Sequence, residues 1–243
     1  MNEMFGWRAR LGVLVPSINK TIEPELYKMA PEGVSVHFSR LRQREDTVEE
    51  LQRMADDVPR GAAELADAEV DVIAFGCTSG SLIGGPGYDQ QLIKKIESVA
   101  HIPAITTSTA VISALKELGI RTLCVATPYI DAVNEREEKF LESHGFKTIN
   151  MKGLGCKGPE TADLSPKTIY KHAKAVFRPG ADGLFMSCTD LRTSDILEVL
   201  EHDLNKPVVS SNQATMWMML KSAGIGDPIE GYGTLLTRRR ING

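Results

Sequence analysis

The second half of this 243-residue chain repeats the first half. Residues 10–15 resemble residues 121–126, and residues 71–78 resemble residues 182–189, with both pairs 111 positions apart. A third pair, residues 103–107 and 207–211, is 104 positions apart because the preceding loop is shorter in the second half. The Cys-Thr dipeptides that begin at Cys77 and Cys188 match in the same register, which favours an internal duplication over a chance likeness. We therefore expect two similar halves related by a pseudo-twofold axis.

Short apolar segments alternate with amphipathic segments along both halves. The apolar segments lack a polar face, which is typical of parallel strands covered by helices on both sides. The sequence predicts an α/β fold of two similar parallel-sheet αβα halves, with the active site in the cleft between them. We expect the first half over residues 8–118 and the second over residues 119–236. The C-terminal residues are candidates to cross over and complete the first half.

The apolar and helical periodicities also predict individual elements. We expect one helix over residues 47–68, bent at Pro59, and a glycine-rich loop between residues 76 and 88. Strands are predicted at residues 11–15, 34–40, 70–75, 104–107, 122–126, 147–151, 183–187 and 208–210. The other helices are predicted at residues 21–30, 89–99, 109–118, 130–144, 166–177, 194–204 and 214–223.

Composition and charge exclude several classes of protein. The net charge is −4 and the pI is near 5.8, which argues against a nucleic-acid partner. No apolar run approaches the ~18 residues of a membrane span, and the N-terminus has no signal-peptide core, so we expect a cytoplasmic protein. Four cysteines are too few for a disulfide scaffold, and their spacing does not suit structural zinc. We therefore expect no metal.

Cys77 and Cys188 each follow a buried strand and precede a polar segment. Ligands of open α/β sheets bind at the carboxyl ends of strands, where backbone N–H groups favour negative charge. A cysteine at such a position is expected to have a lowered pKa and a larger thiolate fraction. Cys124 lies inside a strand and Cys156 has no matching partner, so both are read as structural residues. The matched pair is the candidate catalytic pair.

Polar loops follow the other strands at the same end of each sheet. Residues 77–81 offer N–H groups and hydroxyls that could hold a carboxylate. Residues 16–21 follow the first strand, residues 127–129 occupy the equivalent place in the repeat, and residues 210–213 follow the last strand. Residues 153–158 match a dinucleotide-binding glycine spacing, but the helix signal begins too late, so no cofactor is predicted. The candidate substrate-binding residues are Ser17, Asn19, Thr78, Ser79, Tyr129, Thr189 and Asn212.

The two cysteine motifs give the chain a resemblance to the aspartate/glutamate racemase superfamily. It looks most like the branch that contains maleate cis–trans isomerases, arylmalonate decarboxylases and ectoine-utilisation isomerase-like proteins. The resemblance covers residues 8–236 and implies an enzyme with no cofactor and no metal. Its most specific segments are residues 15–19, 76–79, 108–110, 126–130, 187–189 and 207–212.

The resemblance implies a role for each matching position. In maleate isomerases the position of Cys77 is a nucleophile that adds to the alkene, and the position of Cys188 manages the proton. In racemases the two thiols act as base and acid on opposite faces of the α-carbon. Arylmalonate decarboxylases keep only the second cysteine, and the positions of Thr78, Ser79 and Tyr129 bind the carboxylate. In maleate isomerases the positions of Asn19 and Tyr129 bind a substrate carboxylate.

Two charged residues depart from the maleate isomerase pattern. Asp163, or a neighbour in residues 160–163, takes the place of an asparagine that contacts substrate, and its charge disfavours a dicarboxylate. Arg192 is a candidate partner of a distal carboxylate, with a surface salt bridge as the alternative reading.

The leading hypothesis is a cofactor-independent isomerase or racemase of a small carboxylic or dicarboxylic acid. It resembles a maleate cis–trans isomerase that works through Cys77 and Cys188. The alternatives are an arylmalonate-type decarboxylase that uses Cys188, and a non-catalytic protein that binds a small carboxylate. We expect a homo-oligomer with no nucleic-acid or membrane partner.

Overall fold

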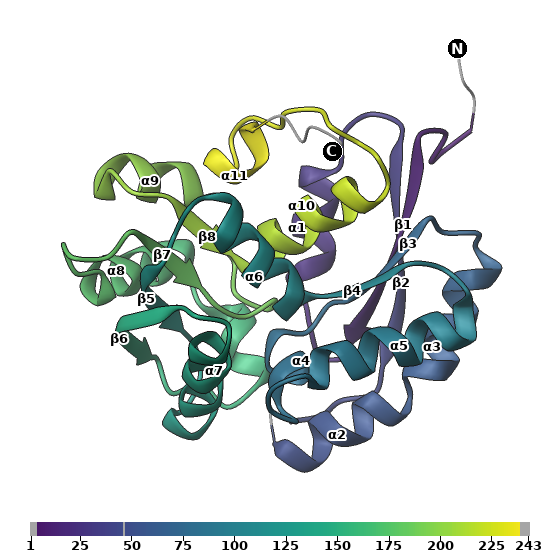
Figure 1. Cartoon of the computed structure of the whole chain (residues 1–243), viewed down its shortest axis with the longest axis horizontal. Coiled ribbons are helices and arrows are strands. Elements are labelled where there is room, and N and C mark those ends of the chain that lie inside the picture. Colours follow the sequence, from purple (N-terminus) through teal and green to yellow (C-terminus); the bar gives the residue numbers. More distant parts are fainter. Residues whose placement is uncertain (1–3, 46, 239–243) are drawn as a thin grey trace.

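The computed structural model describes residues 4–45 and 47–238 and contains two four-stranded parallel sheets (Figure 1). The first sheet has the order β2-β1-β3-β4, and the second has the matching order β6-β5-β7-β8. The predicted α/β class and paired parallel sheets are therefore confirmed. The strands are β1 (Ala9–Pro16), β2 (Val34–Leu41), β3 (Val72–Phe75), β4 (Ala104–Thr106), β5 (Thr122–Thr127), β6 (Lys147–Gly153), β7 (Gly183–Met186) and β8 (Val208–Ser210).

Apolar side chains form three clusters around these sheets. The central cluster includes Val13 of β1 and Val125 of β5, so both sheets share it. Leu14 of β1 belongs to a second cluster on the outer face of the first sheet. Cys124 of β5 belongs to a third cluster on the outer face of the second sheet. Because neighbouring residues of a strand point to opposite faces, every strand except β6 supplies two clusters, which explains why these strands are continuously apolar.

Helices cover each of these faces. Figure 1 shows α1 (Ile22–Met29), α6 (Thr107–Glu117) and α10 (Ser211–Ser222) between the two sheets, where they supply the central cluster together with α7 (Asp131–Ser143). The outer face of the first sheet is covered by α2 (Val48–Asp56), α3 (Val58–Asp67) and α5 (Tyr88–Ala100). The outer face of the second sheet is covered by α8 (Pro166–Val176) and α9 (Leu197–Leu204). The remaining helices are α4 (Thr78–Leu82), the 3₁₀ helix η1 (Pro159–Asp163) and α11 (Thr234–Thr237).

The helix predicted over residues 47–68 is two helices, so that prediction was wrong in one respect. α2 ends at Asp56, and α3 begins at Val58 with Pro59 in its first turn. Proline lacks an N–H group, and the first turn of a helix is the place where that donor is not needed. Pro59 therefore begins a new helix instead of bending a continuous one.

The loop predicted after Cys77 was also wrong, because residues 78–82 form the short helix α4. The Cys77 side chain caps this helix by accepting a hydrogen bond from the backbone N–H of Gly80. The Ser81 hydroxyl donates to the backbone carbonyls of Cys77 and Thr78. Serine and glycine are weak helix formers, so the sequence favoured a loop, and these side-chain contacts stabilise the helical turn.

The duplication extends to the caps of two helices. Thr106 and Thr109 form a capping box at the start of α6, and Ser210 and Gln213 form the same box at the start of α10. α10 then packs on α1 and α6, which belong to the first half of the chain. The boundary between residues 118 and 119 stays a prediction. No helix within residues 4–45 and 47–238 has the length and apolar character that crossing a membrane requires.

Candidate active site

A cavity of about 20 Å³ lies at the carboxyl ends of β1, β3, β5 and β7. This volume accommodates roughly one water molecule, so a larger ligand requires the cavity walls to move. Both sheets and both cysteine motifs contribute to the walls, as the duplication predicts. Seven of the nine predicted site residues line the cavity: Cys77, Cys188, Asn19, Thr78, Ser79, Tyr129 and Thr189.

Cys77 presents its sulfur at the start of α4. The side chain is 5% exposed, and its Sγ accepts a hydrogen bond from the Gly80 N–H at 3.3 Å. The Ser79 hydroxyl lies 3.8 Å from the same sulfur. Hydrogen bonds donated to a sulfur stabilise its thiolate form, which is the nucleophile. The arrangement therefore suits Cys77 to nucleophilic attack.

Cys188 has a different backbone setting from its sequence counterpart. Its φ is +113°, a conformation that residues other than glycine rarely adopt. The Asp190 N–H lies 3.4 Å from the Cys188 sulfur, and the Cys188 N–H donates to the Ser211 hydroxyl at 3.1 Å. No helix begins after Cys188 before α9, so the two motifs repeat in sequence but differ in conformation.

The strain at Cys188 predicts an unusual response to glycine. We expect Cys188→Gly to be about 1 kcal/mol more stable than Cys188→Ala, because only glycine adopts this φ at little steric cost. Urea unfolding of the two variants measures the difference. At Cys124, inside β5, the order should reverse, since glycine destabilises a strand relative to alanine. A Cys188→Gly variant no more stable than Cys188→Ala would show that the backbone is unstrained.

The threonines that follow the cysteines each bond across to the other half. The Thr78 hydroxyl donates to Ser211 Oγ at 2.9 Å, and the Thr189 hydroxyl donates to the Gly76 carbonyl at 3.2 Å. Ser211 thus accepts hydrogen bonds from both Thr78 and the Cys188 backbone. These reciprocal contacts hold the two cysteine segments in one site.

Asn19 and Tyr129 supply neutral donors to the cavity. Asn19 Oδ1 accepts from the N–H groups of Thr21 and Ile22, and one N–H of its Nδ2 bonds to Thr189 Oγ1 at 3.1 Å. Burial raises the pKa of Tyr129 well above its ordinary value, with a smaller contribution from Cys188, to which its side chain hydrogen bonds. Tyr129 therefore stays a phenol and keeps its O–H as a donor.

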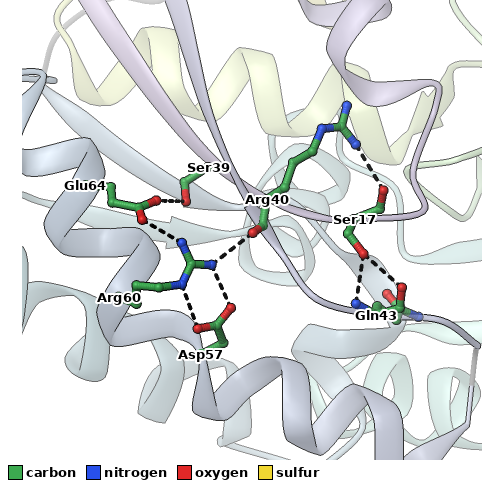
Figure 2. Close-up of polar contacts among 7 residues, drawn as sticks. All are labelled: Ser17, Ser39, Arg40, Gln43, Asp57, Arg60 and Glu64. Carbon is green, nitrogen blue, oxygen red and sulfur yellow. Dashed lines mark hydrogen bonds and ion pairs between the residues drawn. The ribbon is translucent and has the colours of Figure 1, made fainter.

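Ser17 and Asn212 do not line the cavity. Asn212 is buried behind it, where its Nδ2 donates to Glu25 Oε2 and to the Thr189 carbonyl. Ser17 is exposed, and Figure 2 shows its hydroxyl donating to the Gln43 carbonyl and accepting from the Gln43 N–H. The structure thus places both residues behind others that reach the cavity: Gln43 beside Ser17, and Thr189 beside Asn212.

A polar cluster fixes the end of β2, from which the Gln43 segment continues. In Figure 2, Arg60 donates to the carboxylates of Asp57 and Glu64 and to the Arg40 carbonyl. The Arg60 guanidinium holds the pKa of Asp57 below its ordinary value. Multidentate arginine contacts of this kind fix geometry as well as contribute energy. The cluster therefore holds in place the end of β2, which leads to Gln43 in the cavity wall.

The structure places Asp163 and Arg192 outside the lining of this cavity. Asp163 is 74% exposed and pairs with Lys20 Nζ at 2.9 Å, so it does not bring an unpaired negative charge to the cavity. Thr161, two residues earlier in η1, lines the cavity instead. Arg192 lines a separate cavity of about 320 Å³ that also includes Lys20 and Asp163. Neither charged residue therefore argues for or against a dicarboxylate.

Two polar residues of the cavity, Asp190 and Gln43, were missed from the sequence, whereas Thr161 lies within residues 160–163, where the resemblance implied a residue that contacts substrate. Asp190 directly follows the second Cys-Thr dipeptide, and that position was a usable signal. Gln43 comes from a connecting segment with no motif, so only the folded chain brings it to the site. Within residues 4–45 and 47–238, no cluster of three His, Cys, Asp or Glu side chains is placed to hold a metal ion.

Asp190 makes stability depend on pH. Burial raises its pKa to about 6, against the opposing hydrogen bond from the Lys20 N–H. The raised pKa means that its stabilising contribution is complete below about pH 4 and is lost as pH rises through 6. We expect Asp190→Asn to remove about 2 kcal/mol of the stability difference between pH 4.5 and pH 7. Urea unfolding at both pH values measures this difference, and Asp163→Asn, an exposed change, serves as the control.

Comparisons with known proteins identify the relatives of this chain. A sequence model of the arylmalonate decarboxylase family matches residues 11–236. Maleate isomerase of Alcaligenes faecalis is 27% identical across 94% of this chain and 96% of its own length. Arylmalonate decarboxylase of Bordetella bronchiseptica is 33% identical across 78% of this chain and 80% of its own length. The crystal structure of maleate isomerase from Pseudomonas putida S16 matches with a TM-score of 0.91 at 29% identity, over 94% of this chain and 98% of that chain. This chain therefore belongs to the arylmalonate decarboxylase family.

Proposed function

We propose that this protein is a cofactor-independent cis–trans isomerase of a small unsaturated dicarboxylic acid of the maleate class. The observation that carries the proposal is the presence of two thiols, Cys77 and Cys188, in one polar cavity. A decarboxylase that works through one cysteine needs only the second thiol. The maleate isomerases of Alcaligenes faecalis and Pseudomonas putida S16 support the same reading, because each aligns with nearly the whole chain.

The reaction divides between the two thiols. The Cys77 thiolate adds to one alkene carbon, and Cys188 gives its proton to the other, which leaves a saturated thioether with a freely rotating C–C bond. After rotation, the Cys188 thiolate removes the proton, the C–S bond breaks, and the trans alkene leaves. Asn19 and the Tyr129 phenol bind the carboxylate on which negative charge develops. No atom is gained or lost over the cycle, so no cofactor is required.

Decarboxylation of an arylmalonate-type acid is the second candidate function. It is favoured by the 33% identity to the Bordetella bronchiseptica decarboxylase. The hydrogen bond between Tyr129 and Cys188 also suits a thiol that protonates an enediolate formed by loss of CO₂. This reaction would leave Cys77 without a chemical role.

One experiment distinguishes the two. The protein is incubated in D₂O with maleate, aspartate, hydantoin and arylmalonate-type acids, and the products are followed by NMR. We expect maleate to give its trans isomer. Release of CO₂ from an arylmalonate would indicate the decarboxylase instead. Deuterium exchange at the α-carbon of aspartate would indicate a racemase. No reaction with any acid of the panel would contradict enzyme function of this class.

Several finer points stay predictions. They are the contacts of the site residues with substrate, the domain bounds 8–118 and 119–236, the homo-oligomeric state and the cytoplasmic location. Size-exclusion chromatography with light scattering tests the oligomeric state directly.

A further inference from the structure

One buried carboxyl group next to the site has no part in the proposed reaction. Glu137 of α7 is 1% exposed, and its Oε1 accepts a hydrogen bond from the Ser187 hydroxyl at 2.5 Å. Its Oε2 is fully buried and has no hydrogen-bond partner among the described residues. Buried polar atoms are nearly always paired, so an unpaired carboxyl oxygen beside a reactive thiol segment calls for a functional explanation.

The other half of the protein offers a comparison. Glu25, on the first helix after the first strand, is also buried, but its carboxylate receives the N–H groups of Thr193 and Ser194 and the Nδ2 of Asn212. Those donors oppose the effect of burial, which still raises the pKa of Glu25. Glu137 has Ser187 alone, and burial raises its pKa to about 7. Glu137 is therefore protonated under mildly acidic conditions and becomes a poorly compensated charge above neutrality.

Two contacts connect Glu137 to the reactive sulfur. Ser187, its hydrogen-bond donor, is the residue directly before Cys188. Tyr129 hydrogen bonds to Cys188, and the charge of Glu137 acts on Tyr129. A negative charge at Glu137 would therefore oppose a second negative charge on the Cys188 sulfur.

We propose that Glu137 is a positioning residue for Cys188: as a neutral acid it holds Ser187 and permits the Cys188 thiolate, and as a carboxylate it suppresses that thiolate. The consequence for turnover rests on the proposed function, whereas the effect on the thiol does not. Ionisation of Glu137 thus lowers the thiolate fraction of Cys188 above neutral pH.

Among the charged and titratable groups around α7, Glu137 is the one expected to change the thiolate fraction of Cys188. The charge of Glu137 acts on Tyr129, which in turn hydrogen bonds to Cys188. On β6, which packs against α7, the charged residues are Lys147 and Lys152, and both are exposed. α4, which also packs against α7, contains no titratable side chain, and Arg136 of α7 itself donates to the Ile83 carbonyl.

The test measures alkylation of Cys188 by iodoacetamide in a Cys77→Ala background, with the site of modification assigned by mass spectrometry. Rates are compared between Glu137 and Glu137→Gln proteins from pH 5.5 to pH 9. We expect the two rates to agree below pH 6 and the Gln variant to react about tenfold faster at pH 9, as a shift of one unit in the thiol's pKa produces. A ratio that does not change with pH would overturn the proposal.

Two further variants test whether the pH dependence comes from Glu137. Ser187→Ala removes the hydroxyl that donates to Glu137 and favours its ionised form. The pH at which the alkylation rate begins to depend on Glu137 should therefore be higher in this variant. Glu142→Gln, an exposed change on the same helix, should leave the profile unaltered. If the Gln variant does not fold, NMR of ¹³C-labelled glutamate in the unsubstituted protein measures the Glu137 titration directly. A midpoint below pH 5 would contradict the proposal.

The alkylation rate tests this inference independently of the proposed function. Alkylation needs no substrate, so a protein that fails to isomerise maleate still reports whether Glu137 controls Cys188. Where turnover is found, Cys188 must carry its proton when the cycle begins, so the Glu137 protein should keep its kcat to higher pH than the Gln variant, with little difference in KM.

Discussion

Replacing Cys77 by alanine is expected to lower kcat/KM for cis–trans isomerisation about a thousandfold or more. The variant loses the sulfur that forms the covalent bond to the alkene, and without that bond the C=C axis cannot rotate. The Cys77 side chain is buried in the cavity and caps α4, so the alanine variant should also lose about 1 kcal/mol of stability. Initial rates measured by NMR at 25 °C, with unfolding curves for the same protein, separate the two effects.

Cys156→Ala is the matched control for this prediction. It removes a different thiol, which is partly exposed and does not line the cavity that holds Cys77 and Cys188. Its rate should stay within about twofold of the parent protein. If Cys77→Ala keeps substantial CO₂ release from an arylmalonate while isomerisation is undetectable in both proteins, the decarboxylase reading is correct and the role assigned to Cys77 is wrong.

The sequence predicted the parts of this protein that depend on local pattern and on repetition. The strands are short and apolar, and the offset between matching segments assigns each strand of one sheet its partner in the other. That reasoning also brought Cys77 and Cys188 to one cavity. The elements that it misjudged are those decided by tertiary contacts. α4 forms although its composition favours a loop, because the Cys77 sulfur and the Ser81 hydroxyl satisfy its backbone groups.

Site residues on motifs were predicted better than residues on connections. Thr78 and Thr189 follow the cysteines directly, so the duplication identified both. Gln43 reaches the cavity from a segment with no motif, and its position depends on distant contacts such as the Ser17–Gln43 pair. Equal sequence did not guarantee equal conformation either, since Cys188 has a positive φ and Cys77 is extended.

Glu25→Ala is expected to lower the free energy of unfolding by about 3–5 kcal/mol. The Glu25 carboxylate of the first half accepts hydrogen bonds from Thr193, Ser194 and Asn212 of the second half, each at 2.7 Å. Alanine leaves these three buried donors unpaired, and each unpaired donor costs about 1–3 kcal/mol. Urea unfolding followed by circular dichroism measures the change, with the slope of the transition expected to stay constant.

Glu25→Gln distinguishes lost hydrogen bonds from lost charge. The glutamine Oε1 can still accept from the N–H groups of Thr193 and Ser194, which both bond to Oε1 of the glutamate. Its amide nitrogen then meets Asn212, whose own Oδ1 is buried without a partner among the described residues. Oδ1 can accept from it after the Asn212 amide flips, although the flip takes the Nδ2 donor away from the Thr189 carbonyl. Burial raises the pKa of Glu25, so removing the charge also relieves a desolvation cost. We therefore expect a loss of only about 1 kcal/mol. Equal losses in the two variants would mean that the charge, not the donor set, joins the two halves at this point.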